Sequence, residues 1–282
     1  MSDLPADSGP TAEAVIKASR RITPGGTEEV RHLVLEVQDP GFRYAEGDSI
    51  AVLVPPPHPG SNAYHVRRYS IANAPALAPS ARATLHLLVR RCFSVDEQSG
   101  QRSPGIASGY LCDARVGDRL LIAGPYPGPF KIPADRRADL LMIGTGTGIA
   151  PFRAFVERIH GRHGGWLGQI RLYYGGRTGL DRRYANDEKT DLSNYYDAGT
   201  FKALKALAKY PLTTCADGLE AHVAEVWGLL QQSDTHVFVS GLDRIAAALD
   251  RLLSEQAGSP QAWQSMKQRL IDEHRWSELL YG

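Results

Sequence analysis

The glycine-rich run Gly144-Thr-Gly-Thr-Gly-Ile-Ala-Pro151 constrains the fold more than any other feature of this sequence. It follows an apolar run, Asp139–Ile143, that is typical of a buried strand, and it precedes a helical stretch from Pro151 to about Arg162. Glycines let backbone N–H groups approach a phosphate closely, and a helix N-terminus adds partial positive charge. Pro151 suits the first helical turn because it has no N–H to leave unpaired. The run therefore predicts either a phosphate-binding strand–turn–helix unit or, more simply, a tight turn.

Two better-known phosphate motifs do not fit this run. Ile149 occupies the place of the last glycine of G-x-G-x-x-G, and no Gly-Lys-Ser/Thr follows as in a P-loop. After the run, strand-like and helical segments alternate, which predicts a parallel sheet with right-handed crossovers. The expected strands are Ile170–Tyr174, Leu212–Cys215 and His236–Ser240, the expected helices are Phe201–Lys209, Ala221–Leu230 and Asp243–Ser254, and the polar stretch Thr178–Thr200 is an expected surface loop.

The first half of the chain has a different pattern, in which short strands are separated by Gly and Pro. They are Val30–Val37, Ser49–Val54, Thr84–Val89 and Arg119–Ala123. This pattern is typical of a barrel or sandwich. One helix is expected at about Ser108–Ala114, with Ser108 as its N-cap. We therefore expect a flexible N-terminus over residues 1–13, a β domain over 14–135 and an α/β domain over 136–282.

Length and composition fit this division and exclude several classes of protein. A chain of 282 residues predicts two domains. The formal charge of +1 argues against a dedicated nucleic-acid binder. The cysteines, Cys92, Cys112 and Cys215, are too few for an iron–sulfur cluster held by this chain alone, and they fit a reducing compartment. No apolar run approaches the roughly 18 residues of a membrane span, and no signal-peptide core is present. We expect a cytoplasmic protein without a metal site.

Two further segments carry groups suited to a charged ligand. Arg67-Arg-Tyr-Ser-Ile71 places a cation, an aromatic ring and a hydroxyl on one expected strand. The period-2 rule puts Arg67 and Tyr69 on one face, with Arg68 and Ser70 on the other. Gly105-Ile-Ala-Ser-Gly-Tyr-Leu-Cys-Asp113 predicts a second helix N-terminus that could hold an anion. Alone, each has a plain structural alternative, a strand with basic edges or a capped helix.

Taken in order, the three segments resemble the plant-type ferredoxin–NADP(+) reductase family. The motifs are R-x-Y-S from Arg67, G-x-x-S from Gly105 and G-T-G-T-G-I-A-P from Gly144. Tyr173-Tyr-Gly-Gly-Arg-Thr178 and a terminal aromatic residue extend the resemblance, which runs from about Ala14 to Tyr281. It implies an N-terminal antiparallel β-barrel that binds FAD and a C-terminal, doubly wound parallel α/β sheet that binds NADP(H).

The resemblance also implies roles for residues of the FAD domain. Arg67 pairs with the FAD pyrophosphate, since a guanidinium fork suits phosphate oxygens. Tyr69 packs on the isoalloxazine, and Ser70 reaches its N5/O4 edge. Phe93, aligned with a gap, stacks on the adenine. The pyrophosphate also receives backbone N–H groups and a hydroxyl from Gly105, Ile106, Ala107 and Ser108.

In the C-terminal domain, the resemblance implies that Gly146, Thr147 and Gly148 line the dinucleotide site. Ser240 lies near nicotinamide C4, where the family usually has cysteine before glycine. Tyr281 covers the flavin face on which the nicotinamide stacks, and it is displaced during turnover.

The end of the chain departs from the family's pattern, which closes on Trp-x-x-Glu-x-Tyr. Here Glu278 comes one place early and Leu279 occupies its slot. A one-residue slip on a strand points the side chain to the opposite face. The family's grouping of hydroxyl, thiol and carboxylate beside the flavin N5 therefore keeps only the hydroxyl of Ser70.

The residues expected at the 2′ end of the nucleotide favour different cofactors. Asp217 stands near where the family often carries Ser-Arg, and a carboxylate there would repel a 2′-phosphate and accept a bond from a ribose hydroxyl. Arg177, in G-G-R-T, matches a phosphate-contacting arginine of bacterial members. NADPH is favoured slightly, and NADH stays possible.

The resemblance implies an FAD-containing NAD(P)H oxidoreductase in which the nicotinamide delivers a hydride to flavin N5. The flavin then releases single electrons to ferredoxin or another separate electron carrier. A non-catalytic FAD-binding or regulatory module is the alternative, motivated by Ser240 and Leu279. The pairs Arg90-Arg91 and Arg136-Arg137 are expected to be solvated or to dock an acidic carrier.

Overall fold

Strand pairing gives two main sheets, one wholly antiparallel and one wholly parallel, in separate units of the chain, Met1–Gly128 and Pro129–Gly282. The structure is a computed structural model that describes residues 9–23, 25–56, 64–76, 82–95, 100–162, 166–176, 201–207, 219–220 and 222–281. The strand Leu212–Cys215 and the loop Thr178–Thr200 expected from the sequence lie outside these ranges. Among the described residues, no helix is long and apolar enough to cross a membrane.

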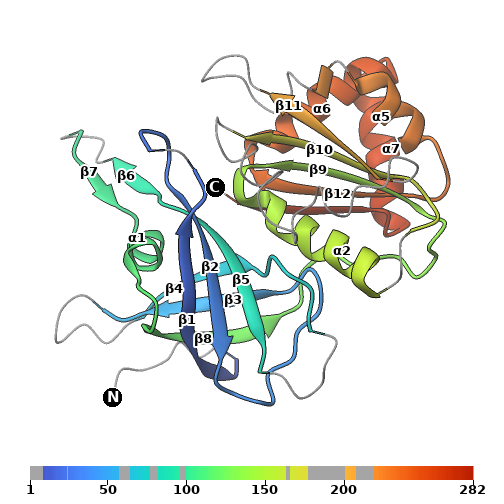
Figure 1. Ribbon diagram of the computed structural model, residues 1–282. Coiled ribbons are helices and arrows are strands. Elements are labelled where there is room, and N and C mark those ends of the chain that lie inside the picture. Colours follow the sequence, from blue (N-terminus) through green and yellow to red (C-terminus); the bar gives the residue numbers. More distant parts are fainter. Residues whose placement is uncertain are drawn as a thin grey trace. The chain divides into compact units, whose positions relative to one another are not determined.

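The first unit carries the antiparallel sheet, with the strand order β4-β3-β8-β1-β2-β5 (Figure 1). Its strands are β1 (Thr11–Arg21), β2 (Val30–Val37), β3 (Ser49–Val54), β4 (His65–Ser70), β5 (Thr84–Arg90) and β8 (Arg119–Tyr126). β1 pairs with β8 from Thr11 onward, so the sheet begins within the segment expected to be flexible. The two outermost strands, β4 and β5, also contact each other, so the sheet curls toward a barrel.

A short helix covers the inner face of this sheet. Leu33 and Leu35 alternate along β2 with partly exposed residues, and they pack with Ala107 and Leu111 of α1 (Ile106–Asp113) in one core. A two-stranded ribbon, β6 (Phe93–Val95) and β7 (Arg102–Pro104), leads from the end of β5 to α1 and extends beyond the sheet in Figure 1. The ribbon and helix thus place residues 93–95 and 100–108 at one end of the barrel.

The second unit carries the parallel sheet, with the strand order β11-β10-β9-β12-β13 (Figure 1). The strands are β9 (Asp139–Thr145), β10 (Ile170–Gly176), β11 (Phe201–Leu207), β12 (Thr235–Leu242) and β13 (Trp276–Tyr281). The helices are a 3₁₀ turn η1 (Gly146–Gly148), α2 (Ile149–Arg162), α5 (Val223–Leu230), α6 (Arg244–Ala257) and α7 (Pro260–Asp272). This arrangement confirms the predicted fold class of an antiparallel β domain followed by a parallel α/β domain.

Helices cover both faces of the parallel sheet, as the alternation of elements predicts. On one face, Phe155 of α2 lies 5.2 Å from Phe238 of β12 between ring centroids. On the other face, Val237 and Val239 of β12 pack with Leu249 of α6. Successive residues of β12 therefore point into two separate cores, which places Ser240 on the same face as Phe238.

Three sequence-based expectations for this unit need correction. The segment predicted as the helix Phe201–Lys209 is β11, because β10 offers it a parallel partner from Ile170↔Phe201 to Gly176↔Leu207. Such tertiary pairing overrides local helix propensity. The helix expected from Pro151 begins at Ile149, directly after η1. Helix α7 was not predicted, although Ser259 caps it by accepting a hydrogen bond from the Ala262 N–H at 3.2 Å.

Candidate cofactor sites

Strand β4 presents two different faces. Arg67 and Tyr69 lie opposite Val52 and Ile50 of β3, which are both buried in the core beside α1. Arg68 points to the other side, where its guanidinium carbon lies 4.1 Å from the centroid of the Tyr126 ring. Residues directly opposite in an antiparallel pair share a face. The predicted separation of Arg67 and Tyr69 from Arg68 and Ser70 is therefore confirmed.

Tyr69 connects this strand to α1. Its ring packs against the core that contains Ala107 and Cys112 of the helix. Burial raises the pKa of the Tyr69 hydroxyl above its ordinary value, Cys92 and Cys112 raise it further, and Arg67 opposes them. Tyr69 therefore stays neutral at physiological pH, with Arg67 on one side and the start of α1 on the other.

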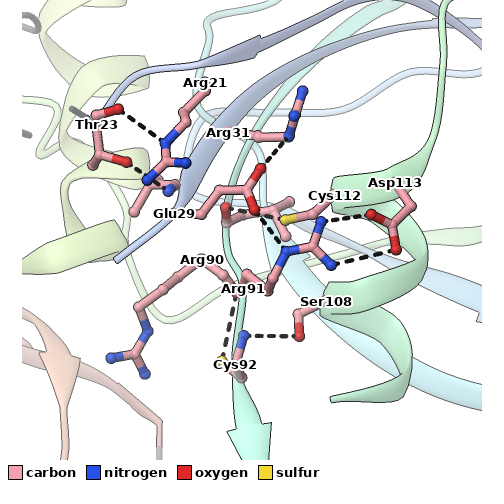
Figure 2. A network of polar contacts seen from close by, with 12 residues as sticks. Arg21, Thr23, Glu29, Arg31, Arg90, Arg91, Cys92, Ser108, Cys112 and Asp113 are labelled. Atoms are coloured by element: carbon pink, nitrogen blue, oxygen red, sulfur yellow. Dashed lines mark hydrogen bonds and ion pairs between the residues drawn. The ribbon is translucent and has the colours of Figure 1, made fainter. Parts of the chain in front are cut away.

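The start of α1 is capped by Gly105 rather than by Ser108, which corrects the sequence-based expectation. Ser108 lies within the first turn, and its Oγ accepts a hydrogen bond from the Cys92 N–H at 3.0 Å (Figure 2). The Gly105 N–H donates to the Cys92 carbonyl at 2.8 Å, so two bonds tie the helix start to the end of β5. The first intrahelical bond runs from the Gly109 N–H to the Gly105 carbonyl. Helix geometry leaves the N–H groups of the next three residues, Ile106, Ala107 and Ser108, without a carbonyl partner inside the helix.

A charged network holds the other end of α1 (Figure 2). Arg91 donates to Glu29 at 2.7 Å and to Asp113, the last residue of α1, at 2.6 Å. Only 17% of the Arg91 side chain is exposed, so the expectation that both Arg90 and Arg91 are solvated is wrong for Arg91. Its hydrogen bonds to Asp113 and Glu29 raise the pKa of the Arg91 guanidinium, and the helix is fixed at both ends.

The ribbon before α1 carries an exposed aromatic ring. Phe93 is 46% exposed, and the Arg102 guanidinium carbon lies 4.4 Å from its ring centroid. Gly105, the N-cap of α1, directly follows this ribbon. Phe93, Arg102 and the first N–H groups of α1 therefore lie on consecutive elements of the chain. Arg102 was not singled out from the sequence, and only its position shortly before Gly105 could have indicated it.

In the second unit, the glycine-rich run packs closely against β12. A Cβ on Gly148 would lie 2.5 Å from the Ser240 carbonyl oxygen and 2.8 Å from the Gly241 nitrogen, both backbone atoms. Gly146 has φ +54°, a left-handed conformation that glycine adopts freely, and a Cβ there would meet open space. The turn therefore needs Gly148 for packing and Gly146 for conformation, which leaves its backbone accessible.

Ser240 is the least satisfied polar residue beside this turn. Its side chain is fully buried, and its Oγ has no hydrogen-bond partner among the described residues. The next residue, Gly241, has φ +145°, and a Cβ on it would lie 2.1 Å from the Thr145 Oγ1. Native proteins rarely leave a buried hydroxyl unpaired, so an unpaired one calls for an explanation such as a missing ligand.

Two tyrosines contact the glycine-rich turn. The Tyr281 hydroxyl lies 2.9 Å from the Thr147 Oγ1, and the Tyr174 hydroxyl donates to the Gly146 carbonyl at 2.8 Å. The sequence analysis gave Tyr174 no role, although this residue is the expected end of the strand Ile170–Tyr174. Thr147 and Tyr281 thus contact each other near the carboxyl ends of β9 and β13, a contact that the sequence analysis did not predict.

The slip at the end of the chain has the predicted result. Leu279 lies opposite Ser240 in the β12–β13 register, whereas Glu278 lies opposite Val239. The Glu278 Oε1 accepts from the Trp276 Nε1 at 2.6 Å and lies 2.9 Å from the Lys267 Nζ on α7. This carboxylate therefore points to the face away from the glycine-rich turn. Arg177 and Asp217, expected at the 2′ end of the nucleotide, lie outside the described residues.

Comparisons with known proteins agree with this arrangement. A family model described as the oxidoreductase NAD-binding domain matches residues 142–251. The ferredoxin–NADP reductase of Picosynechococcus sp. (strain ATCC 27264 / PCC 7002 / PR-6) is 31% identical over 271 residues, which cover 91% of this chain and 66% of that protein. That of Spirulina sp is 29% identical over 262 residues and covers 89% of this chain and 88% of the relative. The chain belongs to the ferredoxin–NADP reductase family.

A solved structure supports the fold of this family member. The ferredoxin–NADP(+) reductase of Plasmodium falciparum superposes with a TM-score of 0.72 over 96% of both chains, at 18% identity. A likeness at that identity speaks for the fold alone. Family membership and fold together agree with the resemblance inferred from the R-x-Y-S, G-x-x-S and G-T-G-T-G motifs.

Proposed function

We propose that this reductase-family chain is an FAD-containing NAD(P)H oxidoreductase that passes electrons from NADPH to a separate one-electron carrier such as ferredoxin. The carrying observation is the buried, unpartnered Ser240 hydroxyl beside a glycine-rich turn at the carboxyl ends of parallel strands. Ligands of parallel sheets bind at that edge. The relatives' name, ferredoxin–NADP reductase, supports the choice of reaction and of partner.

The residues of the first unit fit FAD. The helix start offers the N–H groups of Ile106, Ala107 and Ser108 to a pyrophosphate, and the exposed Arg67 offers a guanidinium. Phe93 offers a ring for the adenine, since nearly half of it is exposed. Because the Ser108 Oγ already accepts from Cys92 and bonds the Gly105 carbonyl, we assign its backbone N–H to the phosphate and its hydroxyl to the turn.

The residues of the second unit fit a nicotinamide dinucleotide. Gly146 and Thr147 are partly exposed at a helix start, Gly148 lets the turn pack against β12, and Ser240 provides a buried hydroxyl for the nicotinamide end. Bound FAD and nucleotide would supply the hydride and electron chemistry, as in other flavoprotein reductases. The chain's own contribution is to orient both groups and to keep the Ser240 hydroxyl shielded from water.

Proton handling falls to a hydroxyl rather than to a carboxylate. Glu278 is bound to Lys267 and Trp276 on the far face of β13, so it is not available beside Ser240. Ser70, at the end of β4, is the family-matched hydroxyl that we propose to hold a proton near the flavin edge. Tyr69, whose pKa is raised by burial, lies on the other face of β4.

Choice of nucleotide rests, in our proposal, on two residues outside the described ranges. Arg177 favours the 2′-phosphate of NADPH, and Asp217 opposes it. Arg177→Ala should lower the kcat/KM for NADPH roughly tenfold, or about 1.4 kcal/mol, and leave NADH nearly unchanged. Asp217→Ala should improve NADPH relative to NADH. If Arg177→Ala lowers both equally, the arginine contacts a shared part of the cofactor, and the preference for NADPH loses its support.

Rapid mixing of the FAD-loaded protein with NADPH or NADH tests the function itself. Fast loss of the flavin absorbance band, followed by reduction of an added ferredoxin, is the expected result. An unchanged flavin spectrum with either nucleotide would contradict the enzyme and favour a non-catalytic FAD-binding module, the role that the Ser240 and Leu279 departures would suit.

A further inference from the structure

A cluster of charged and indole groups lies on the face of the second sheet opposite the glycine-rich turn. The Lys267 Nζ lies 2.9 Å from the Glu278 Oε1 and 3.2 Å from the Asp250 Oδ1. The Trp276 Nε1 donates to the same Glu278 oxygen at 2.6 Å, and the Trp263 Nε1 donates to the same Asp250 oxygen at 2.7 Å. We call these five residues the Lys267 clamp.

The clamp is a shielded and directional arrangement rather than a surface ion pair. Only 13% of the Lys267 side chain is exposed, and its Nζ also lies 5.2 Å from the centroid of the Trp276 ring. Trp263 and Trp276 themselves pack edge to face at 5.5 Å between centroids. Exposed ion pairs are weak because water screens them and because long side chains lose freedom. Here the indole N–H groups and packed rings fix both carboxylates, so the geometry is preset.

The clamp joins the last strand to the helices behind it. Asp250 belongs to α6, Lys267 to α7 and Glu278 to β13. β13 is an edge strand that pairs only with β12 in the described sheet, and it carries the last described residues of the chain. A strand paired on one side only opens more easily than a central strand, unless side chains tie it down. The clamp supplies such a tie at Glu278, shortly before Tyr281.

Tyr281 lies on the other face of the same strand. Side chains alternate along a strand, so Glu278 points toward α7 and Tyr281 toward η1, where its hydroxyl meets the Thr147 Oγ1 at 2.9 Å. Thr147 belongs to the turn proposed above to bind the nicotinamide dinucleotide. A nucleotide group that takes the place of the Tyr281 hydroxyl at Thr147 must therefore displace that contact.

We propose that the Lys267 clamp is a positioning device that holds β13 so that Tyr281 covers Thr147, and that it thereby lowers the affinity for the nicotinamide end of the nucleotide. This inference rests on the proposed function. Lys267 touches no ligand; it acts through Glu278 and the strand. The clamp also gives a role to the glutamate that stands one place early, because Glu278 binds Lys267 on the α7 face of β13 instead of facing the glycine-rich turn.

The test compares two ligands on two backgrounds. NADP(+) carries a nicotinamide, whereas 2′-phospho-AMP probes the adenosine end alone. Calorimetric titration of FAD-loaded Lys267→Met should show NADP(+) binding that is tighter by about three- to tenfold, the range of one hydrogen bond between neutral groups. Binding of 2′-phospho-AMP should stay unchanged. In a Tyr281→Ser background, Lys267→Met should have no further effect on NADP(+).

Matched variants separate positioning from general stability. Lys267→Arg keeps the charge and should restore the wild-type NADP(+) affinity. Arg251→Gln is the control: Arg251 lies on α6 outside the clamp and forms an exposed ion pair with Glu220. Its loss should change the binding of neither ligand. Glu278→Gln replaces Lys267→Met if that variant does not fold, because its amide oxygen still accepts from Trp276 while the charge that pairs with Lys267 is lost.

Four outcomes would overturn the inference. Unchanged NADP(+) affinity in both clamp variants would show that the clamp does not control Tyr281. An equal loss of affinity for NADP(+) and for 2′-phospho-AMP would show a purely structural role. So would a change in NADP(+) affinity on Lys267→Met that is the same with Tyr281 as with Tyr281→Ser. If the wild type binds neither NADP(+) nor 2′-phospho-AMP, the proposed function fails, and the inference falls with it.

Discussion

The two glycine-bearing turns of this molecule, at the start of α1 and at the start of α2, are built in opposite ways. At α1 the polar groups of the chain pair with one another: the Ser108 Oγ accepts from Cys92, and the Gly105 N–H donates back to Cys92. At α2 the Ser240 hydroxyl is buried with no partner among the described residues, and Tyr281 covers Thr147 through one hydroxyl contact.

The difference indicates two kinds of occupant. A turn whose serine and glycine pair with the chain itself, braced at the far end of its helix by Arg91 and Asp113, suits a ligand that stays bound. A turn with an unpaired buried hydroxyl and a cover that must move suits a ligand that enters and leaves. This contrast matches a resident FAD and an exchanging nucleotide, and the predictions below test it.

The largest effect is expected from Gly148→Ala. Its new Cβ would lie 2.5 Å from the Ser240 carbonyl oxygen, and neither backbone segment can move aside cheaply. We expect a loss of about 3 kcal/mol or more in unfolding free energy, the upper end for overpacking, together with loss of NADP(+) binding. Urea unfolding and calorimetric titration would measure both.

Gly105→Ala is the matched control for that substitution. Its Cβ would meet the Ser108 Oγ at 2.8 Å, which is a rotatable side-chain atom, so the cost should be about 1 kcal/mol, one hydrogen bond. Equal costs at the two glycines would contradict the closer packing that we assign to the turn at α2.

Arg67→Ala should give the next largest effect, and it should change the affinity for FAD only. Losing a guanidinium from the FAD pyrophosphate should weaken FAD binding by about 1.5–3 kcal/mol, measured by flavin fluorescence on titration. Arg68→Ala removes the same charge from the opposite face, over Tyr126, and should leave FAD affinity nearly unchanged. The protein should release FAD rather than FMN on denaturation, and similar FAD losses in both variants would indicate a general charge effect.

Arg91→Gln should weaken the brace of α1 in a pH-dependent way. Burial alone would raise the pKa of Glu29, but hydrogen bonds from Arg91 and Arg31 outweigh it and hold that pKa below its ordinary value. The hydrogen bond from Arg91 likewise lowers the pKa of Asp113. A carboxyl group whose pKa is lowered in the folded state stabilises the fold. Its full contribution is present at a pH above the ordinary pKa of about 4, and it is lost as the pH falls through the lowered pKa.

The variant should therefore lose roughly 1–2 kcal/mol at neutral pH, toward the lower end for bonds to charged groups because Asp113 is 72% exposed. The difference from wild type should shrink below about pH 4, where the carboxylates are protonated in both proteins. Thermal unfolding across this pH range measures it. A difference that stays constant with pH would show that Arg91 acts through packing alone.

Much of the fold was accessible from sequence patterns because periodicity reports burial. The branched run Val30–Val37 and the alternation after residue 139 each indicated the right sheet type. The segment Phe201–Leu207 was misassigned because its strand state depends on a partner, β10, that local sequence does not contain. Helix α7 was missed although Ser259 and Pro260 form an ordinary start signal.

The positions of site residues could be predicted where a motif fixes the backbone conformation. They could not be predicted where they depend on side-chain contacts with other parts of the fold. The faces of Arg67 and Arg68 follow from period 2, and the displacement of Glu278 follows from its one-residue slip. No pattern reveals that Ser108 bonds Cys92 or that Glu278 meets Lys267, because these contacts join residues far apart in sequence.

The smallest effect, and the sharpest comparison, comes from the two buried serines. Ser108→Ala removes the acceptor of the Cys92 N–H and should cost about 1 kcal/mol, the usual net worth of a hydrogen bond. Ser240→Ala removes a buried hydroxyl that has no partner in the described chain, so the nucleotide-free protein should gain up to about 1 kcal/mol. The gain should come with a loss: the rise in Tm that saturating NADP(+) gives the wild type should be smaller in Ser240→Ala and unchanged in Ser108→Ala, since ligand stabilisation follows affinity. Thermal unfolding of both variants with and without NADP(+) measures all four quantities. If Ser240→Ala is destabilised and keeps its full response to NADP(+), the Ser240 hydroxyl only contributes to packing on the α2 face. The contrast between a serine that pairs within the chain and a serine that needs a ligand then does not hold.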